Sequence, residues 1–216
     1  MNYPSTTPTA RPLVISDCDE VLLHMVTHFR DYLAEDHGID FALDNGDWGK
    51  ALTWRETGAV LEPADIWKHL NLFFDHEMDR QHPIAGAVES INAIAEHADV
   101  VILTNLLDER RDKRAEQLKG YGIEAPVYTN QGPKGPALAA ILEERRPSRA
   151  LFIDDLAQHH GSAKEVVPQV TRLHLCGEPA IAPHIACGLE AGHAHARIDD
   201  WEHALPWILE RLEEDA

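Results

Sequence analysis

Four aspartates follow two apolar segments that lie far apart in the chain. Asp17 and Asp19 come after LVIS, and Asp154 and Asp155 come after LFI. If both segments are parallel strands of one open sheet, the carboxylates converge on the crevice beyond the carboxyl ends of the strands. Four carboxylates in one crevice repel each other unless a divalent cation or protonation compensates their charge. Magnesium prefers carboxylate, water and phosphate oxygens, so the sequence predicts a Mg²⁺ site and a phosphate substrate.

A third apolar segment, VVIL, ends at another polar residue, Thr104. Taken singly, an Asp or Thr after a strand is often the cap of the helix that follows. Three such strand ends in one chain favour a shared site over three independent caps.

The elements that would position these residues can be read from the apolar pattern. Five segments have the length of strands buried on both faces, and they span residues 12–16, 99–103, 126–128, 149–153 and 170–175. Between them, apolar residues recur at helical spacing, as in Ile84, Val88, Ile91 and Ile94. Similar stripes span residues 115–118, 138–142 and 201–212. This alternation predicts an α/β fold with a parallel sheet sandwiched by helices.

One interval is too long for a single crossover connection, because about sixty residues separate the first strand from the helix near Ile84. Two helical stripes lie in it. Their members are Leu22, Met25, Val26, Phe29 and Leu33 in the first stripe, and Trp67, Leu70, Phe74 and Met78 in the second. We therefore expect a small helical insertion over residues 22–82. Its tryptophans, Trp48, Trp54 and Trp67, are expected to give it a core of its own, with Trp67 and Phe74 as core residues.

Composition excludes several classes of function. The chain has 216 residues and a formal net charge of −18, which repels a nucleic-acid polymer or an anionic membrane surface. Its apolar segments are far shorter than a membrane-spanning helix. Residues 1–12 are rich in proline and threonine and are expected to be a flexible lead without an export signal, which indicates a cytoplasmic protein. The cysteines Cys18, Cys176 and Cys187 lack CxxC spacing, so reduced thiols are expected.

Four segments carry a resemblance to a known family. LVISDCDEVL, VVILTNL, GPKGPAL and ALFIDD resemble, in their usual order, the signature motifs of the haloacid dehalogenase-like hydrolase superfamily. The resemblance implies a Rossmann-like core domain formed by residues 13–21 and 83–216, with residues 22–82 as a helical cap. It also implies an enzyme that uses Mg²⁺ to release phosphate from a small phosphorylated metabolite.

The resemblance assigns the chemistry to two aspartates. Asp17 is expected to be the nucleophile that attacks phosphorus and forms an aspartyl-phosphate. Asp19 is expected to protonate the leaving oxygen and afterwards to deprotonate water, while its backbone carbonyl binds the metal.

The other motif residues are expected to bind the phosphoryl group and the metal. Thr104 and the backbone amide of Asn105 would donate hydrogen bonds to a phosphoryl oxygen. Lys134 would neutralise charge on the transferred group and on the nucleophile. Asp155, with Asp154 beside it, would hold Mg²⁺ together with the nucleophile.

Asp19 also separates two chemistries within the superfamily. Members that cleave carbon–halogen bonds generally lack an acid at this position, whereas phosphatases and phosphomutases need one for an oxygen leaving group. The chain departs from the common DxDGT pattern, because Glu20 and Val21 follow Asp19, as in members that resemble deoxynucleotidases. A phosphatase is favoured; a phosphomutase, a nucleotidase and a catalytically silent binding protein stay open as alternatives.

Two further groups of residues are interpreted as structural. The basic residues after the second motif alternate with acids, which is typical of a solvated helix face, although they could also attract an anionic substrate. These residues are Arg110, Arg111, Lys113 and Arg114. The histidine-rich segment 174–203 fits no zinc pattern and is interpreted as a loop. The sequence identifies neither the substrate nor the oligomeric state.

Overall fold

The computed structural model describes residues 11–43 and 50–213, and its centre is a sheet of six parallel strands. Their order is β5 (Val127–Thr129), β4 (Asp99–Thr104), β1 (Leu13–Ser16), β6 (Ala150–Asp154), β7 (Thr171–His174) and β8 (Ala196–Arg197). The five predicted strands are confirmed, each to within one residue at either end. β8 was not predicted, because two residues are too few to show a pattern.

The central position of β1 places the predicted site. Ile102 of β4 and Ile153 of β6 are level with the last residue of β1. The polar residues at the ends of these three strands, Asp17, Thr104 and Asp154, therefore emerge within one residue of the same level. Sheet register alone brings them to one edge.

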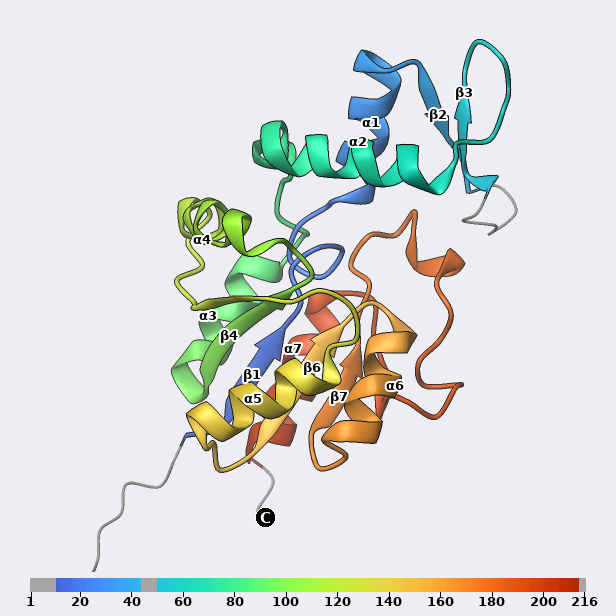
Figure 1. The fold of residues 1–216 in the computed structure, drawn as a ribbon. Coiled ribbons are helices and arrows are strands. Elements are labelled where there is room, and N and C mark those ends of the chain that lie inside the picture. The colour runs from blue at the N-terminus through green and yellow to red at the C-terminus, as the bar shows by residue number, and fades with distance from the viewer. Residues whose placement is uncertain (1–10, 44–49, 214–216) are drawn as a thin grey trace, which may run out of the picture.

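Helices cover both faces of the sheet, which makes a Rossmann-like sandwich (Figure 1). α5 (Gly135–Arg145) and α6 (Ala157–Val166) pack on one face, and α3 (Ala87–His97) and α7 (Trp201–Glu213) pack on the other. α4 (Arg111–Gly120) joins the second layer, and two short 3₁₀ helices, η3 (Asp108–Arg110) and η4 (Ala182–His184), lie in the connections. The sequence did not predict α6, because histidines make up much of its buried side. Within the described ranges, no helix has the length and hydropathy needed to cross a bilayer.

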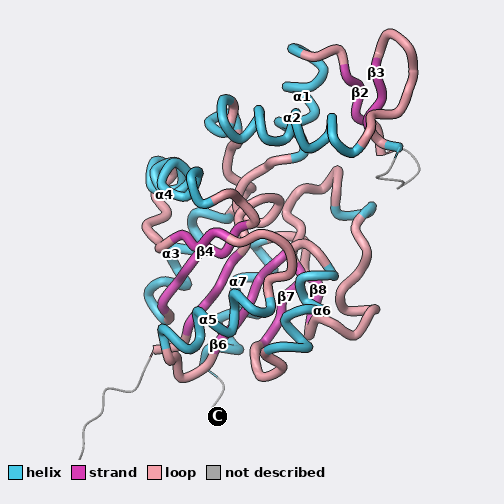
Figure 2. Tube along the Cα trace, viewed as in Figure 1, coloured by secondary structure: helices cyan, strands magenta, loops and turns pink. Residues whose placement is uncertain are grey.

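Residues 22–82, here called the inserted segment, leave the sheet after β1 and return before α3. They form α1 (Val26–Asp36), an antiparallel hairpin of β2 (Ile39–Phe41) and β3 (Leu52–Trp54), α2 (Pro63–His76) and the 3₁₀ helix η2 (Met78–Arg80). Figures 1 and 2 show these elements beyond the carboxyl ends of the sheet strands. Both helices agree with the prediction. The hairpin was not predicted, because each of its strands has only three residues.

Two predicted helix starts are wrong by three or four residues. α1 begins at Val26 rather than near Leu22, which is buried in the core between the sheet and α3. The carboxylate of Glu20 accepts hydrogen bonds from the backbone N–H groups of Met25 and Val26, and this fixes the start of the helix. α3 likewise begins after Ile84.

The tryptophans do not form the core of the inserted segment. Trp67 is 64% exposed, and Trp54 is only partly buried. Trp48 lies outside the described residues, as do residues 1–10 of the expected lead. Phe74 is buried as expected, and Phe73 packs beside it, so phenylalanines provide the aromatic core. The buried residues of α2 are His69, Phe73 and Phe74, and Trp67 is not among them.

Two buried histidines, His160 of α6 and His174 of β7, make the stability of the fold depend on pH. The rings of His160 and His174 stack with centroids 5.5 Å apart. Burial lowers the pKa of His174 from 6.5 to about 4, with the neighbouring His160 adding to the effect. The unfolded chain therefore binds this proton more readily than the folded protein. Stability that is present above pH 6.5 is lost as the pH falls from 6.5 toward 4.

We expect the substitution His174→Asn to reduce the loss of stability between pH 6.5 and pH 4. The backbone N–H of Gly188 donates to Nδ1 of His174, and an asparagine side chain keeps an acceptor there but does not titrate. Between pH 6.5 and 5, the free energy of unfolding of the variant should decrease by about 1 kcal/mol less than that of the parent. Urea unfolding at a series of pH values measures the difference. Parallel pH profiles for the two proteins would contradict the expectation.

Candidate active site

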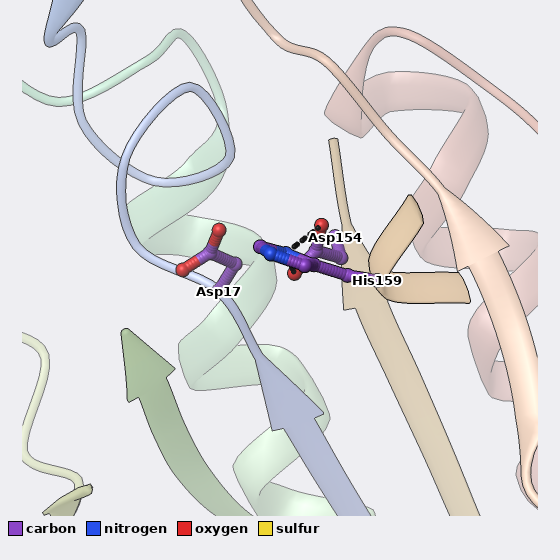
Figure 3. Close-up of side chains that lie close together, drawn as sticks. All are labelled: Asp17, Asp154 and His159. Carbon is purple, nitrogen blue, oxygen red and sulfur yellow. Dashed lines mark hydrogen bonds and ion pairs between the residues drawn. The ribbon is translucent and has the colours of Figure 1, made fainter. Parts of the chain in front are cut away.

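A buried lysine joins the carboxylates at the ends of two neighbouring strands. The Nζ atom of Lys134 lies 2.7 Å from Oδ1 of Asp17 and 2.7 Å from Oδ2 of Asp154. Lys134 and Asp154 are fully buried, and Asp17 is 6% exposed. Figure 3 shows Asp17 and Asp154 beside each other at the ends of β1 and β6, with the ring of His159 against Asp154. The structure thus brings together three of the predicted site residues.

The charged groups of this cluster shift one another's pKa values. Burial alone would lower the pKa of Lys134, but the carboxylates of Asp154 and Asp17 hold it above its ordinary value. Burial would raise the pKa of Asp154, yet Lys134 and His159 hold it well below its ordinary value. For Asp17, burial is the largest effect, and it raises the pKa to about 6 against the opposing effect of Lys134. Asp17 is therefore a poorly hydrated carboxylate of raised basicity beside a fixed ammonium group.

Lys134 reaches the cluster because α5 begins directly after it and packs closely on α6. The backbone N–H of Gly135 donates to Oγ of Ser162 at 3.0 Å. A Cβ atom at Gly135 would lie 2.4 Å from the backbone oxygen of Ser162, so only glycine allows this approach. The close contact between the two helices holds the lysine against the carboxyl end of β6.

His159 completes the surroundings of Asp154. Its Nδ1 lies 3.1 Å from both carboxylate oxygens, and the backbone N–H of Leu156 donates to Oδ1 at 2.8 Å. These contacts fix the orientation of the carboxylate. Sequence analysis missed His159. The signal that could have found it is the His-His pair in the first turn of the helix after LFIDD.

Asp19 is held by two side chains that sequence analysis did not connect with it. Its Oδ1 accepts hydrogen bonds from Nε2 of Gln81 at 2.7 Å and from Nη2 of Arg114 at 3.1 Å. Arg114 also donates to Oε1 of Gln81 at 3.0 Å and to Sγ of Cys18 at 3.2 Å. Arg114 is fully buried, so its interpretation as part of a solvated helix face is wrong. α4 turns this residue toward the loop after β1.

The interpretation is also wrong for Arg110. This residue is 9% exposed and donates to Oδ1 of Asp75 at 2.8 Å and to Oδ1 of Asn71 at 2.9 Å, both on α2. Arg111 does face solvent, where it pairs with Asp112. The basic residues after β4 therefore divide between contacts to the inserted segment and the surface.

Thr104 and Asn105 lie at the end of β4. The hydroxyl of Thr104 is buried and has no hydrogen-bond partner among the described residues. Leaving a buried hydroxyl unpaired is unfavourable, so this group is available to a ligand oxygen. The side chain of Asn105 donates to the carbonyl of Gly132 and accepts from Asn130, which ties the end of β4 to the loop before Lys134.

A cavity of about 570 Å³ opens over the cluster. Its lining on the sheet side is Asp17, Asp19, Glu20, Asn105, Asp155, Leu156, Gln158 and His159. Lys134, Asp154 and Thr104 are buried and do not line it. Burial, followed by the charges of Asp154 and Asp17, raises the pKa of Asp155 well above its ordinary value. A cation beside Asp155 would relieve that repulsion.

The donor set suits a hard divalent cation. Ligand atoms of Asp17, Asp154 and His159 lie within 4.8 Å of one another, and Asp155 adds a carboxylate to the same cavity. Carboxylate oxygens at this density are the ligands that Mg²⁺ prefers in proteins. The residues present therefore fit the predicted ion.

The histidine-rich segment 174–203 holds the connections after β7 against the sheet and α6. Nδ1 of His195 accepts a hydrogen bond from the backbone N–H of Arg172. The ring of His193 lies against Gly161, where an added Cβ atom would be 3.1 Å from its Nδ1. These contacts give His193 and His195 a structural role.

Comparison with known proteins gives matches of fold. No protein-family model matches the chain, and no curated protein matches its sequence. A HAD family hydrolase from Deinococcus radiodurans R1, solved with bound phosphate and sodium, has a TM-score of 0.65 and 18% sequence identity. The match covers 97% of this chain and 99% of that chain.

Two further solved structures agree with it. A HAD-superfamily hydrolase of subfamily IA, variant 1, from Geobacter sulfurreducens PCA has a TM-score of 0.57 and 18% identity, over 96% of this chain and 99% of that chain. A haloacid dehalogenase-like family hydrolase from Streptococcus pneumoniae has a TM-score of 0.59 and 12% identity, over 93% of this chain and 98% of that chain. The chain therefore has the fold of the haloacid dehalogenase-like hydrolases, as its motifs predicted.

The division among the basic residues can be tested by a matched pair of variants. Arg114→Met should lower the free energy of unfolding by about 3 kcal/mol, because it removes the buried hydrogen bonds that Arg114 donates to Asp19 and Gln81. Arg111→Met, in the same helix, should change it by less than about 0.5 kcal/mol, because that side chain is exposed. Urea unfolding measures the free energy of unfolding of both variants. Equal losses would show that the buried contacts of Arg114 stabilise the fold no more than the exposed ion pair of Arg111 does.

Proposed function

We propose that this chain belongs to the haloacid dehalogenase-like superfamily and hydrolyses a small phosphomonoester, with Asp17 as the nucleophile and Mg²⁺ as the cofactor. The observation that carries the proposal is the contact of Lys134 with both Asp17 and Asp154 at adjoining strand ends. A fixed cation at this place attracts a phosphoryl group to the carboxylate beside it. The neighbour with bound phosphate has the same fold.

Asp17 supplies the attacking oxygen. Lys134 and the backbone N–H of Cys18 both donate to Oδ1, so we assign the attack to Oδ2. The bond from Oδ2 to phosphorus forms as the bond from phosphorus to the leaving oxygen breaks. Water then attacks the phosphorus of the aspartyl-phosphate, which releases inorganic phosphate and restores the carboxylate. Lys134 and the unpaired hydroxyl of Thr104 stabilise the charge on the phosphoryl oxygens.

Asp19 moves the protons of both steps. It protonates the leaving oxygen in the first step and accepts a proton from the attacking water in the second. Gln81 and Arg114 hold its Oδ1, which leaves Oδ2 for proton transfer. In this proposal, Arg114 is a positioning residue that acts through Asp19.

Asp17, Asp154, Asp155 and the backbone carbonyl of Asp19 would hold Mg²⁺. When bound, the ion neutralises the excess of carboxylate charge and the negative charge of the substrate phosphate. Among the described residues, the buried lysine and arginine side chains that pair with these aspartates are Lys134 and Arg114.

We assign the inserted segment the role of a cap over the site. Its helices contribute Val26, Trp67, Leu70 and Phe74 to the cavity that Asp17 lines. Both of its connections to the sheet domain, before α1 and after η2, run beside the loop that carries Asp17. Closure of such a segment excludes water and strengthens the attraction between charges in the site.

Phosphate release should depend on Mg²⁺. With phenyl phosphate as substrate, we expect release in the presence of magnesium, loss of release in excess chelator, and recovery when magnesium is returned. The reason is that the clustered carboxylates cannot accept a phosphate dianion without a compensating cation. Circular dichroism in chelator provides the control for folding. Full activity in chelator would refute the metal requirement.

Substitutions should distinguish the roles of the two aspartates of the DxD motif. Asp17→Asn should abolish turnover, because the nucleophile is lost. Asp19→Asn keeps the backbone carbonyl and should lower turnover about a hundred- to ten-thousand-fold, since acid–base catalysis is lost. Asp112→Asn, at an exposed carboxylate of α4, is the matched control and should retain the parent rate. Turnover near the parent value in Asp19→Asn would rule out its proton-transfer role.

A further inference from the structure

The cavity over the carboxylate cluster has two chemically different parts. One part is the acidic cluster that ends at Asp17. The other part is apolar, and it is built from both sides of the cavity. Its principal members are Val26 of α1, Trp67, Leu70 and Phe74 of α2, and Ile181 and Ile185 of the connection after β7.

The cavity wall offers little positive charge. In the part of the chain that the structure describes, no lysine or arginine lines the cavity, and the ring of His159, which does line it, is engaged by Asp154. Arg114 is engaged by Asp19, and Arg110 is engaged by Asp75. Glu20 lines the cavity and is a further acidic group. A second phosphate or a carboxylate on the substrate would therefore meet no cation there.

Hydroxyl groups would also find few partners in the apolar part. Two amide side chains, those of Asn105 and Gln158, line the cavity, and that of Asn105 is already bonded to Gly132 and Asn130. Transfer of a sugar hydroxyl from water to this wall without a new hydrogen bond is unfavourable. A methylene group gains from the same transfer, by about fourfold in affinity for each one buried.

Trp67 supports the same conclusion. It lines the cavity although 64% of its surface is exposed, so a large aromatic side chain stands in water beside the site. A ligand with an apolar part would cover that surface. The cavity volume of about 570 Å³ is also in the range of small-molecule sites.

From this lining we infer that the substrate is the phosphate monoester of an apolar alcohol, alkyl or aryl, without a second anionic group. The inference rests on the proposed phosphatase function and specifies its substrate class. The phosphate lies at Asp17, and the apolar part lies against Leu70 and Phe74 of the inserted segment.

A homologous series of substrates tests it. The n-alkyl phosphates from ethyl to octyl share one leaving-group chemistry and differ only in apolar surface. We expect kcat/KM to rise about fourfold per methylene until the cavity is filled. Sorbitol 6-phosphate, which has the same carbon number as hexyl phosphate, should react about a hundredfold less efficiently than that ester. A kcat/KM that does not change with chain length, or one that is higher for sorbitol 6-phosphate than for hexyl phosphate, would overturn the inference.

A binding measurement separates failure of the inference from failure of the proposed function. The n-alkyl phosphonates have no phosphate ester to hydrolyse, and calorimetric titration with magnesium present measures their affinity. Affinity that rises with chain length supports the apolar site, whether or not the esters are hydrolysed. Affinity independent of chain length overturns it. Absence of phosphate release from every ester would count against the proposed phosphatase function alone.

A matched pair of variants locates the apolar contact. Trp67→Ala should lower kcat/KM for octyl phosphate about tenfold more than for ethyl phosphate, because only the longer ester covers that side chain. Val60→Ala removes another exposed apolar side chain of the inserted segment that does not line the cavity, and it should change neither substrate. An equal effect of Trp67→Ala on both esters would place the alkyl chain elsewhere and overturn the assignment to α2.

Discussion

One buried ammonium group determines the arrangement of the carboxyl ends of β1 and β6. Lys134 contacts Asp17 and Asp154, and without it two neighbouring carboxylates would be buried with no compensating charge. The contact requires α5 to begin at the carboxyl edge of the sheet, and Gly135 lets that helix pack closely on α6. The electrostatic interaction on which the proposed chemistry depends therefore requires the close packing of these two helices.

The loop after β1 links this interaction to the inserted segment. Glu20 adopts a φ of +60°, an unusual conformation for a residue other than glycine, at the position where the common DxDGT motif has glycine. Its carboxylate binds the first N–H groups of α1, and these hydrogen bonds offset the strain. At the other end of the segment, Gln81 binds Asp19. Both ends of the inserted segment are thus hydrogen-bonded to the loop that carries Asp17. These bonds set the position of the apolar cavity wall relative to the carboxylates.

The sequence by itself determined the sheet and the position of its polar ends. Segments such as 100–103 are apolar throughout, which is the pattern of a strand buried on both faces. Once such strands are parallel and adjacent, Asp17, Thr104 and Asp154 must emerge at one edge, whatever the details of packing. The resemblance of the motifs to those of the superfamily placed Lys134 in the same group. The positions of the strand-end residues need only local patterns and the topology of a parallel sheet.

Only the tertiary structure decided which charged and aromatic residues are buried. Arg111 and Arg114 are three positions apart in α4, yet one faces solvent and the other reaches Asp19. The difference comes from the packing of α4 against the end of the inserted segment, which no local pattern encodes. For the same reason His159 was missed and Trp67 was placed in the core. Burial is a relation between elements that are distant in the chain, so it is fixed only when those elements pack.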